Sequence, residues 1–182
     1  MRRTVLLAAA ALSFTAAAPA FADAPVEVAI GPKLAEKTRS YGPREINDMR
    51  DFLDRIATSA INRKGAAPIA RADLVLEDAV PNAPTSAQYG RNQGLSMWSV
   101  GLGGAHIGGT VTTTDGQVHP INYAFYESFW QQPQPPHRWR DATRAFEMAT
   151  SQIAKGRFPN AARTMSPSGD GDFGAWRANK NR

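Results

Sequence analysis

The chain contains no cysteine. Disulfide bonds are therefore excluded, and so is attachment to a membrane through the lipid-modified cysteine of a lipoprotein. Thiol nucleophiles and thiolate metal ligands are excluded for the same reason. If the protein is exported, its stability has to come from its hydrophobic core, because small exported domains otherwise rely on disulfides.

Histidine is also scarce, with three residues at positions 106, 119 and 137. A zinc site needs three or four converging ligands. If Asp115-Gly116 closes a two-residue turn, His119 lies opposite Thr112, roughly 20 Å along the strand from His106. His137 follows a proline-rich stretch and can approach only one of the other two. We therefore expect no metal site and no cofactor.

The chain has little excess charge of either sign. Its formal net charge is +5, and removing the first 22 residues, which hold two basic and no acidic side chains, leaves +3. Several of the remaining basic residues lie in the last 26 positions. A charge this small and scattered does not form the basic face that nucleic-acid binding requires. We expect no nucleic-acid partner.

The chain has one long hydrophobic run, at its N-terminus. Met1-Arg2-Arg3 is followed by an apolar stretch over 4–18 and then by Pro19-Ala20-Phe21-Ala22. A basic start, a short apolar run and small residues before a cleavage point are typical of a signal peptide, here over 1–22. The run is too short to span about 30 Å of hydrocarbon, which argues against a membrane anchor. We expect a periplasmic or secreted protein with no transmembrane segment after cleavage.

The remaining 160 residues suffice for one domain with a sizeable core. Alternating apolar residues predict strands over 26–30 and 72–80 and a further strand over 95–102. Asp115-Gly116 predicts a hairpin between 107–113 and 117–126. Apolar residues at helical spacing predict one helix after Pro43 and a second from Trp139 to Ile153.

This order of elements predicts a single α+β domain over residues 23–156. We expect a mostly antiparallel sheet of about four to five strands, with two helices packed on one face. Residues 157–182 are polar and aperiodic and are predicted to be a disordered C-terminal tail.

No motif in the chain requires a reaction. The glycine-rich run over 101–109 is followed by a predicted strand rather than a helix, which favours bends or close packing over a phosphate cradle. Ser96 lacks the glycine pattern and the helix of a nucleophile elbow. Glu77 and Asp78 are adjacent on a predicted strand, where neighbouring side chains face opposite sides. We predict no catalytic residues.

Aromatic residues are the most conspicuous candidates for binding. Trp98, Phe125 and Trp139 are predicted to fill the core between the sheet and the second helix. The aromatic cluster beside the proline-rich segment 131–136 is predicted to form an exposed surface. The candidate binding residues are Trp98, Tyr123, Tyr126, Phe129 and Trp130.

The sequence resembles a poorly characterised group of proteobacterial envelope proteins, several of them lipoproteins. Their domain is similar to the small α+β domain of curli-transport and Tol-associated envelope proteins. The resemblance covers roughly residues 25–156 and rests on segments 26–30, 72–78, 103–105, 113–118 and 139–146. It implies an α+β fold and an envelope location, and no catalytic residue. Unlike the lipoprotein members, this chain lacks an anchoring cysteine.

These observations favour a non-enzymatic periplasmic protein that binds another envelope component through a sheet edge or an aromatic surface. One alternative is a small-molecule or glycan binder with a pocket near Trp98, Tyr123 and Trp130. A third is a hydrolase that uses Ser96, His106 or His119 with an acidic residue. The oligomeric state is left open.

Overall fold

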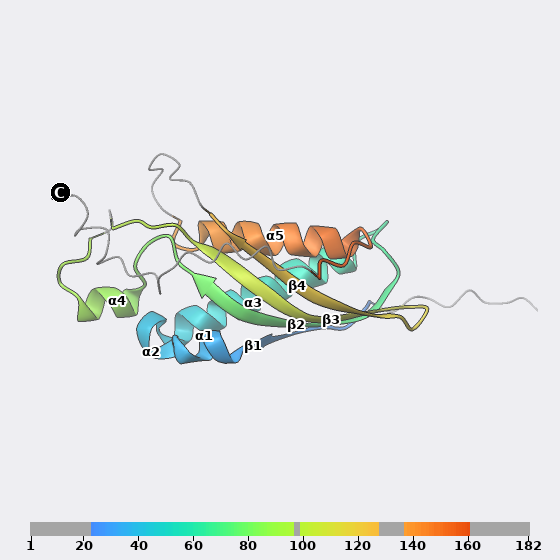
Figure 1. Ribbon diagram of the computed structural model, residues 1–182, viewed down its shortest axis with the longest axis horizontal. Coiled ribbons are helices and arrows are strands. Elements are labelled where there is room, and N and C mark those ends of the chain that lie inside the picture. Colours follow the sequence, from blue (N-terminus) through green and yellow to red (C-terminus); the bar gives the residue numbers. More distant parts are fainter. Residues whose placement is uncertain (1–22, 97–98, 128–136, 161–182) are drawn as a thin grey trace, which may run out of the picture.

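The computed structural model describes residues 23–96, 99–127 and 137–160. Within these ranges the chain forms one four-stranded sheet with two long helices on one face (Figure 1). The predicted single-domain α+β fold is therefore confirmed. The predicted signal peptide and residues 161–182 of the predicted tail lie outside the described residues. In chain order the elements are β1 (Val26–Ile30), α1 (Pro32–Glu36), α2 (Thr38–Tyr41), α3 (Pro43–Ile61), β2 (Ile69–Val80), α4 (Ser86–Arg91), β3 (Gly104–Thr113), β4 (Val118–Tyr126) and α5 (Arg140–Ala154).

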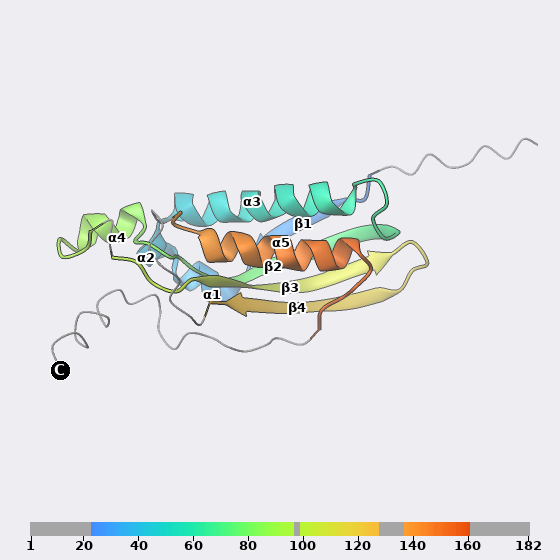
Figure 2. The same ribbon diagram turned by 90° about the horizontal axis from the view of Figure 1, so that it is seen from above.

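The sheet has the strand order β1-β2-β3-β4 and is mixed. β2, β3 and β4 pair antiparallel, whereas β1 runs parallel to β2, with Val28 opposite Leu74. Parallel neighbours need a crossover connection, and α1, α2 and α3 supply it. As a result α3 packs over β1, while α5 packs over β3 and β4 (Figure 2).

The core lies between the sheet and these two helices. α3 begins at Pro43, where the missing N–H is not needed, and it buries a stripe that includes Met49 and Leu53. α5 buries its own stripe around Phe146. Trp139 belongs to this core cluster and Phe125 packs against it, as predicted from the sequence. Trp98 lies outside the described residues. In the described part of the chain, no helix is both long and apolar enough to cross a membrane.

The structure corrects two expectations about the loops. The strand predicted over 95–102 is absent from the described positions of that range, because β3 begins only at Gly104. The sequence predicted no helix between the first strand and Pro43 or after the second strand, but α1 and α2 precede Pro43 and α4 follows β2. Thr85 caps α4 through a capping box with Gln88, a pattern that the sequence itself displays.

The β3–β4 hairpin forms as predicted, but its register differs by one residue. Thr113 N donates to Gln117 O and Gly116 N donates to Thr113 O, so the loop is longer than a two-residue turn. His119 is consequently paired with Val111 rather than Thr112. A shift of one residue reverses the face on which a side chain lies, so His119 belongs to the helix-covered face.

We predict that Gly109→Ala strongly destabilises the protein. Gly109 has φ +123°, and an added Cβ would lie 2.9 Å from Leu74 Cα, closer than carbon atoms approach. We expect a loss of about 3 kcal/mol in the free energy of unfolding, measured by urea denaturation. Gly116→Ala is the matched control: its φ is +83°, but an added Cβ meets nothing within 4 Å. Its expected cost is about 1 kcal/mol, and equal losses in the two variants would contradict the prediction.

Candidate functional site

The predicted aromatic surface is not assembled in the described part of the chain. Trp98, Phe129 and Trp130 lie outside the described residues. Tyr123 packs against the core on the helix-covered face. Tyr126 is buried and lies on the other face of β4, since residues at odd and even positions of a strand face opposite sides. The two described members therefore do not share a surface.

The three residues of the hydrolase alternative make contacts in different parts of the structure. His106 Nε2 lies 2.7 Å from Asn122 Oδ1 on the face of the sheet away from α3 and α5, called here the outer face. His119 stacks on Phe158, with ring centroids 3.9 Å apart. Ser96 N donates to Ser99 Oγ in a loop. None of these three contacts joins one of the residues to another.

Metal binding has no support within the described ranges. Among residues 23–96, 99–127 and 137–160, no three His, Asp or Glu side chains converge in a way that could hold an ion.

Glu77 and Asp78 were expected on opposite faces of the sheet, but their arrangement is different. β2 contains a bulge between Leu76 and Asp78, and Asp78 pairs with His106 of the outer face. A Cβ added to Gly108, also on the outer face, would lie 3.0 Å from Glu77 Oε1. The bulge therefore places both carboxylates on one face, which strict strand alternation does not allow.

Both oxygens of the Asp78 carboxylate nevertheless have partners. Its side chain is 2% exposed and is bound by Lys33 Nζ at 2.7 Å and Lys37 Nζ at 2.8 Å. Tyr126 Oη reaches across Gly104 and donates to Asp78 Oδ2 at 3.2 Å. Burial acts to raise the pKa of the Asp78 carboxyl, but the two ammonium groups outweigh it and hold the pKa below its usual value. Burial and the Asp78 charge raise the pKa of Tyr126.

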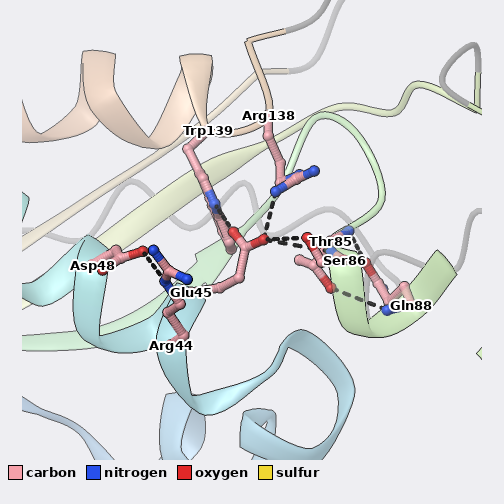
Figure 3. Close-up of polar contacts among 8 residues, drawn as sticks. All are labelled: Arg44, Glu45, Asp48, Thr85, Ser86, Gln88, Arg138 and Trp139. Carbon is pink, nitrogen blue, oxygen red and sulfur yellow. Dashed lines mark hydrogen bonds and ion pairs between the residues drawn. The ribbon is translucent and has the colours of Figure 1, made fainter. Parts of the chain in front are cut away.

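A second polar cluster joins α3 to the start of α5 (Figure 3). Glu45 Oε2 accepts a hydrogen bond from Trp139 Nε1 at 3.0 Å, and Glu45 Oε1 pairs with Arg138 at 2.5 Å. Ser86, at the start of α4, makes a longer contact of 3.4 Å to the same oxygen. Glu45 therefore joins three segments, and both of its carboxylate oxygens are engaged.

Asn82 and Asp141 form a third, buried cluster between the end of β2 and the start of α5. Asn82 Oδ1 accepts from Asp141 N at 2.9 Å, and the Asn82 side-chain amide donates to Asp141 Oδ2. The same carboxylate oxygen accepts from Gly103 N at 3.1 Å. Each of the three clusters joins separate segments of the fold. Single-sequence patterns do not indicate them, because the bonded partners described here are 38 to 94 residues apart.

The two edges of the sheet differ in how their backbone groups are covered. On β4, even-numbered residues direct their N–H groups outward. Pro120 has no N–H to offer, and Asn122 N donates to Pro159 O at 2.7 Å. The first residues of the predicted tail, 157–160, thus lie against β4, and the middle of its edge is blocked.

The outer edge of β1 consists of the backbone N–H and C=O groups of Val26, Val28 and Ile30. In a strand, the backbone groups of successive residues point to opposite sides. Pro25 O and Gly31 N, one residue before and one residue after this set, bond to β2, so the groups of the set point away from β2. Among the described residues, the backbone hydrogen bonds outside the strand ladders involve none of the three. This five-residue edge is the candidate site that the structure offers.

A side chain binds the backbone directly before β1 and so ends its unpaired edge on that side. The side-chain amide of Asn62, which follows α3, accepts from Ala24 N at 2.7 Å and donates to Ala24 O at 3.1 Å. Pro32 follows the strand at its other end. The alternation of Val26-Glu27-Val28-Ala29-Ile30 predicted a half-buried strand, but only the sheet order reveals that no described strand pairs with its outer side.

We predict that Asp78→Asn lowers the free energy of unfolding by about 3 kcal/mol at pH 7, because two lysines lose their buried counter-charge. The folded-state pKa of Asp78 is below its unfolded value, so its stabilisation is present above about pH 4 and disappears as the pH falls further. Urea denaturation at pH 7 and below pH 4 should show the difference between wild type and Asp78→Asn shrinking in acid. A difference that is independent of pH would contradict this assignment.

Glu45→Ala is expected to cost about 2 kcal/mol, because Trp139 Nε1 loses its acceptor and Arg138 its partner. Glu45→Gln retains an acceptor oxygen for Trp139 and should lose about half as much. The control is Arg44→Ala, whose ion pair with Asp48 is exposed and contributes little. Thermal unfolding followed by tryptophan fluorescence measures all three, and a neutral Glu45→Ala would show that the cluster contributes nothing.

The comparisons with protein-family models, with curated proteins and with solved structures find no match.

Proposed function

We propose that this chain is an exported, non-enzymatic protein of the bacterial envelope that binds another polypeptide by strand addition at the outer edge of β1. The observation that supports the binding site is the contrast between the two sheet edges. β4 is blocked at Pro120 and Asn122, whereas Val26, Val28 and Ile30 leave their outward backbone groups without partners among the described residues. Unprotected edges attract another strand, and proteins normally cover them unless they are used.

The side chains of β1 support the same proposal. Val26, Val28 and Ile30 are half-buried, although they pack against the two core clusters. The equivalent residues of β2, such as Leu74 and Leu76, are almost completely buried. An added strand would remove the remaining apolar surface of β1 from water, and main-chain hydrogen bonds would supply further affinity.

The arrangement of the polar residues supports a role without catalysis. The described acidic groups that are buried, Asp78 and Asp141, are satisfied by lysines, an amide or backbone N–H groups. The export and envelope parts of the proposal rest on the signal-like sequence over 1–22 and on the resemblance stated above.

The proposal predicts that Val28→Pro abolishes binding while the protein remains folded. Proline removes the outward N–H of Val28 and leaves the bonds to β2 intact, because β1 bonds to β2 through its odd-numbered residues. The measurement is cross-linking in the native envelope, followed by pull-down of the tagged chain and mass spectrometry. We expect one partner with wild type and at least a tenfold lower yield with Val28→Pro.

The matched control is Ala124→Pro, which removes an outward N–H from β4 instead. It should leave the yield unchanged, and Val26→Pro provides a second block of β1 if Val28→Pro does not fold. Thermal unfolding checks each variant. A partner that is retained by folded Val28→Pro and Val26→Pro, or that is lost with Ala124→Pro, contradicts the proposal.

A further inference from the structure

The side chain of Asn62 takes the place of a strand residue at one end of the β1 edge. Its oxygen accepts from Ala24 N at 2.7 Å, and its nitrogen donates to Ala24 O at 3.1 Å. A hydrogen-bonded residue of an antiparallel pair binds its neighbour in the same way, since it accepts from the N–H and donates to the C=O of one residue. The Asn62 amide therefore satisfies both backbone groups of Ala24, as an added strand would.

Ala24 belongs to the same row of outward backbone groups as the three residues of the β1 edge. Pro25 O accepts from Ala72 N of β2, so the backbone is still aligned with β2 directly before β1 begins. Because the groups of successive residues alternate in direction, those of Ala24 point away from β2. The row thus has four residues. Asn62 binds the first of them and leaves the other three for an added strand.

The position of the Asn62 amide is set by α3. Asn62 N donates to Thr58 O at 3.1 Å and so ends the last turn of the helix. α3 runs back over β1, and its C-terminal end lies beside the start of the strand (Figure 2). The helix that connects β1 to β2 therefore also places this amide at the end of the β1 edge.

The opposite end of the edge is closed by the course of the chain. The next residue of the row after Ile30 is Pro32, which has no N–H and is the first residue of α1. α1 packs against β2, so the chain turns away from the line of the edge at this point. An added strand thus finds the N–H and C=O groups of three residues and meets a boundary on either side of them.

We propose that Asn62 determines the register and the length of the strand that β1 accepts. An antiparallel segment of five residues pairs its first, third and fifth residues with Ile30, Val28 and Val26. Residues beyond the fifth find Ala24 already bound, so the partner segment has to end there or turn away from the sheet. Asn62 thereby excludes pairing that slips past the start of β1. This inference rests on the proposed function, because it concerns the same edge.

The test compares two uncharged, end-capped peptides by NMR titration of the isotope-labelled full chain. The shorter peptide is Val-Thr-Val-Thr-Val, and the longer one adds Thr-Val at its C-terminal end. With wild type we expect affinities equal within twofold, because the two extra residues find no unbound backbone groups. In Asn62→Ala the outward groups of Ala24 become available, and the longer peptide should bind at least fivefold tighter than the shorter one.

The ratio of the two affinities separates a role in register from a role in stability, since a loss of stability alone affects both peptides equally. Asn47→Ala is the matched control, because Asn47 is an exposed asparagine of the same helix, and it should leave the ratio as in wild type. Asn62→Gly provides a second variant if Asn62→Ala does not fold. Thermal unfolding checks each variant.

The outcomes separate this inference from the proposed function. A preference of wild type for the longer peptide above twofold, or a preference of folded Asn62→Ala below fivefold, overturns the inference. Wild type that binds neither peptide overturns it as well. If the cellular partner is nevertheless lost with Val28→Pro, the proposed function stands without it. Failure of the proposed function is a different result, namely a cellular partner that folded Val28→Pro retains.

Discussion

The parallel pairing of β1 with β2 is the constraint on which the arrangement of this protein depends. Two parallel neighbours cannot be joined by a tight turn, so the chain has to leave the sheet after Ile30 and return at Ile69. The connection includes α3, which covers β1 and buries Leu53 and Ala57 against the sheet. α5 then covers the rest of the same face. The helix above β1 follows from this pairing, and β1 is an edge strand of the described sheet because β3 occupies the other side of β2.

Buried polar clusters fasten the helices at one end of the sheet. Asp78 binds one lysine within α1 and a second lysine directly after it. Asp141 joins α5 to the residues after β2 and before β3. Glu45 joins α3 to the residues before α5. A buried carboxylate is tolerated only when ammonium, amide or N–H groups satisfy it. Residue types that suggest catalysis in a sequence are therefore used here to hold secondary structure elements together.

The two edges of the sheet illustrate how differently one fold treats equivalent backbone groups. A proline and a backbone hydrogen bond from the chain after α5 close the middle of β4. Among the described residues, the outward backbone groups near β1 are bound only at its N-terminal end, where the Asn62 side chain bonds to Ala24. Unpaired N–H and C=O groups next to half-buried valines favour pairing with another chain.

The sequence by itself determined the elements whose signals are local. The apolar stripes after Pro43 and Trp139 predicted α3 and α5, and Asp115-Gly116 predicted the hairpin, because helix periodicity and turn preference act within a few residues. The capping box at Thr85, which starts α4, is an equally local signal. Only the tertiary structure decided that β1 pairs parallel to β2, that a bulge turns Glu77 and Asp78 to one face, and that Tyr123 and Tyr126 do not share a surface. Pairing partners, register and the free edge depend on contacts between residues far apart in the chain, and no local pattern encodes them.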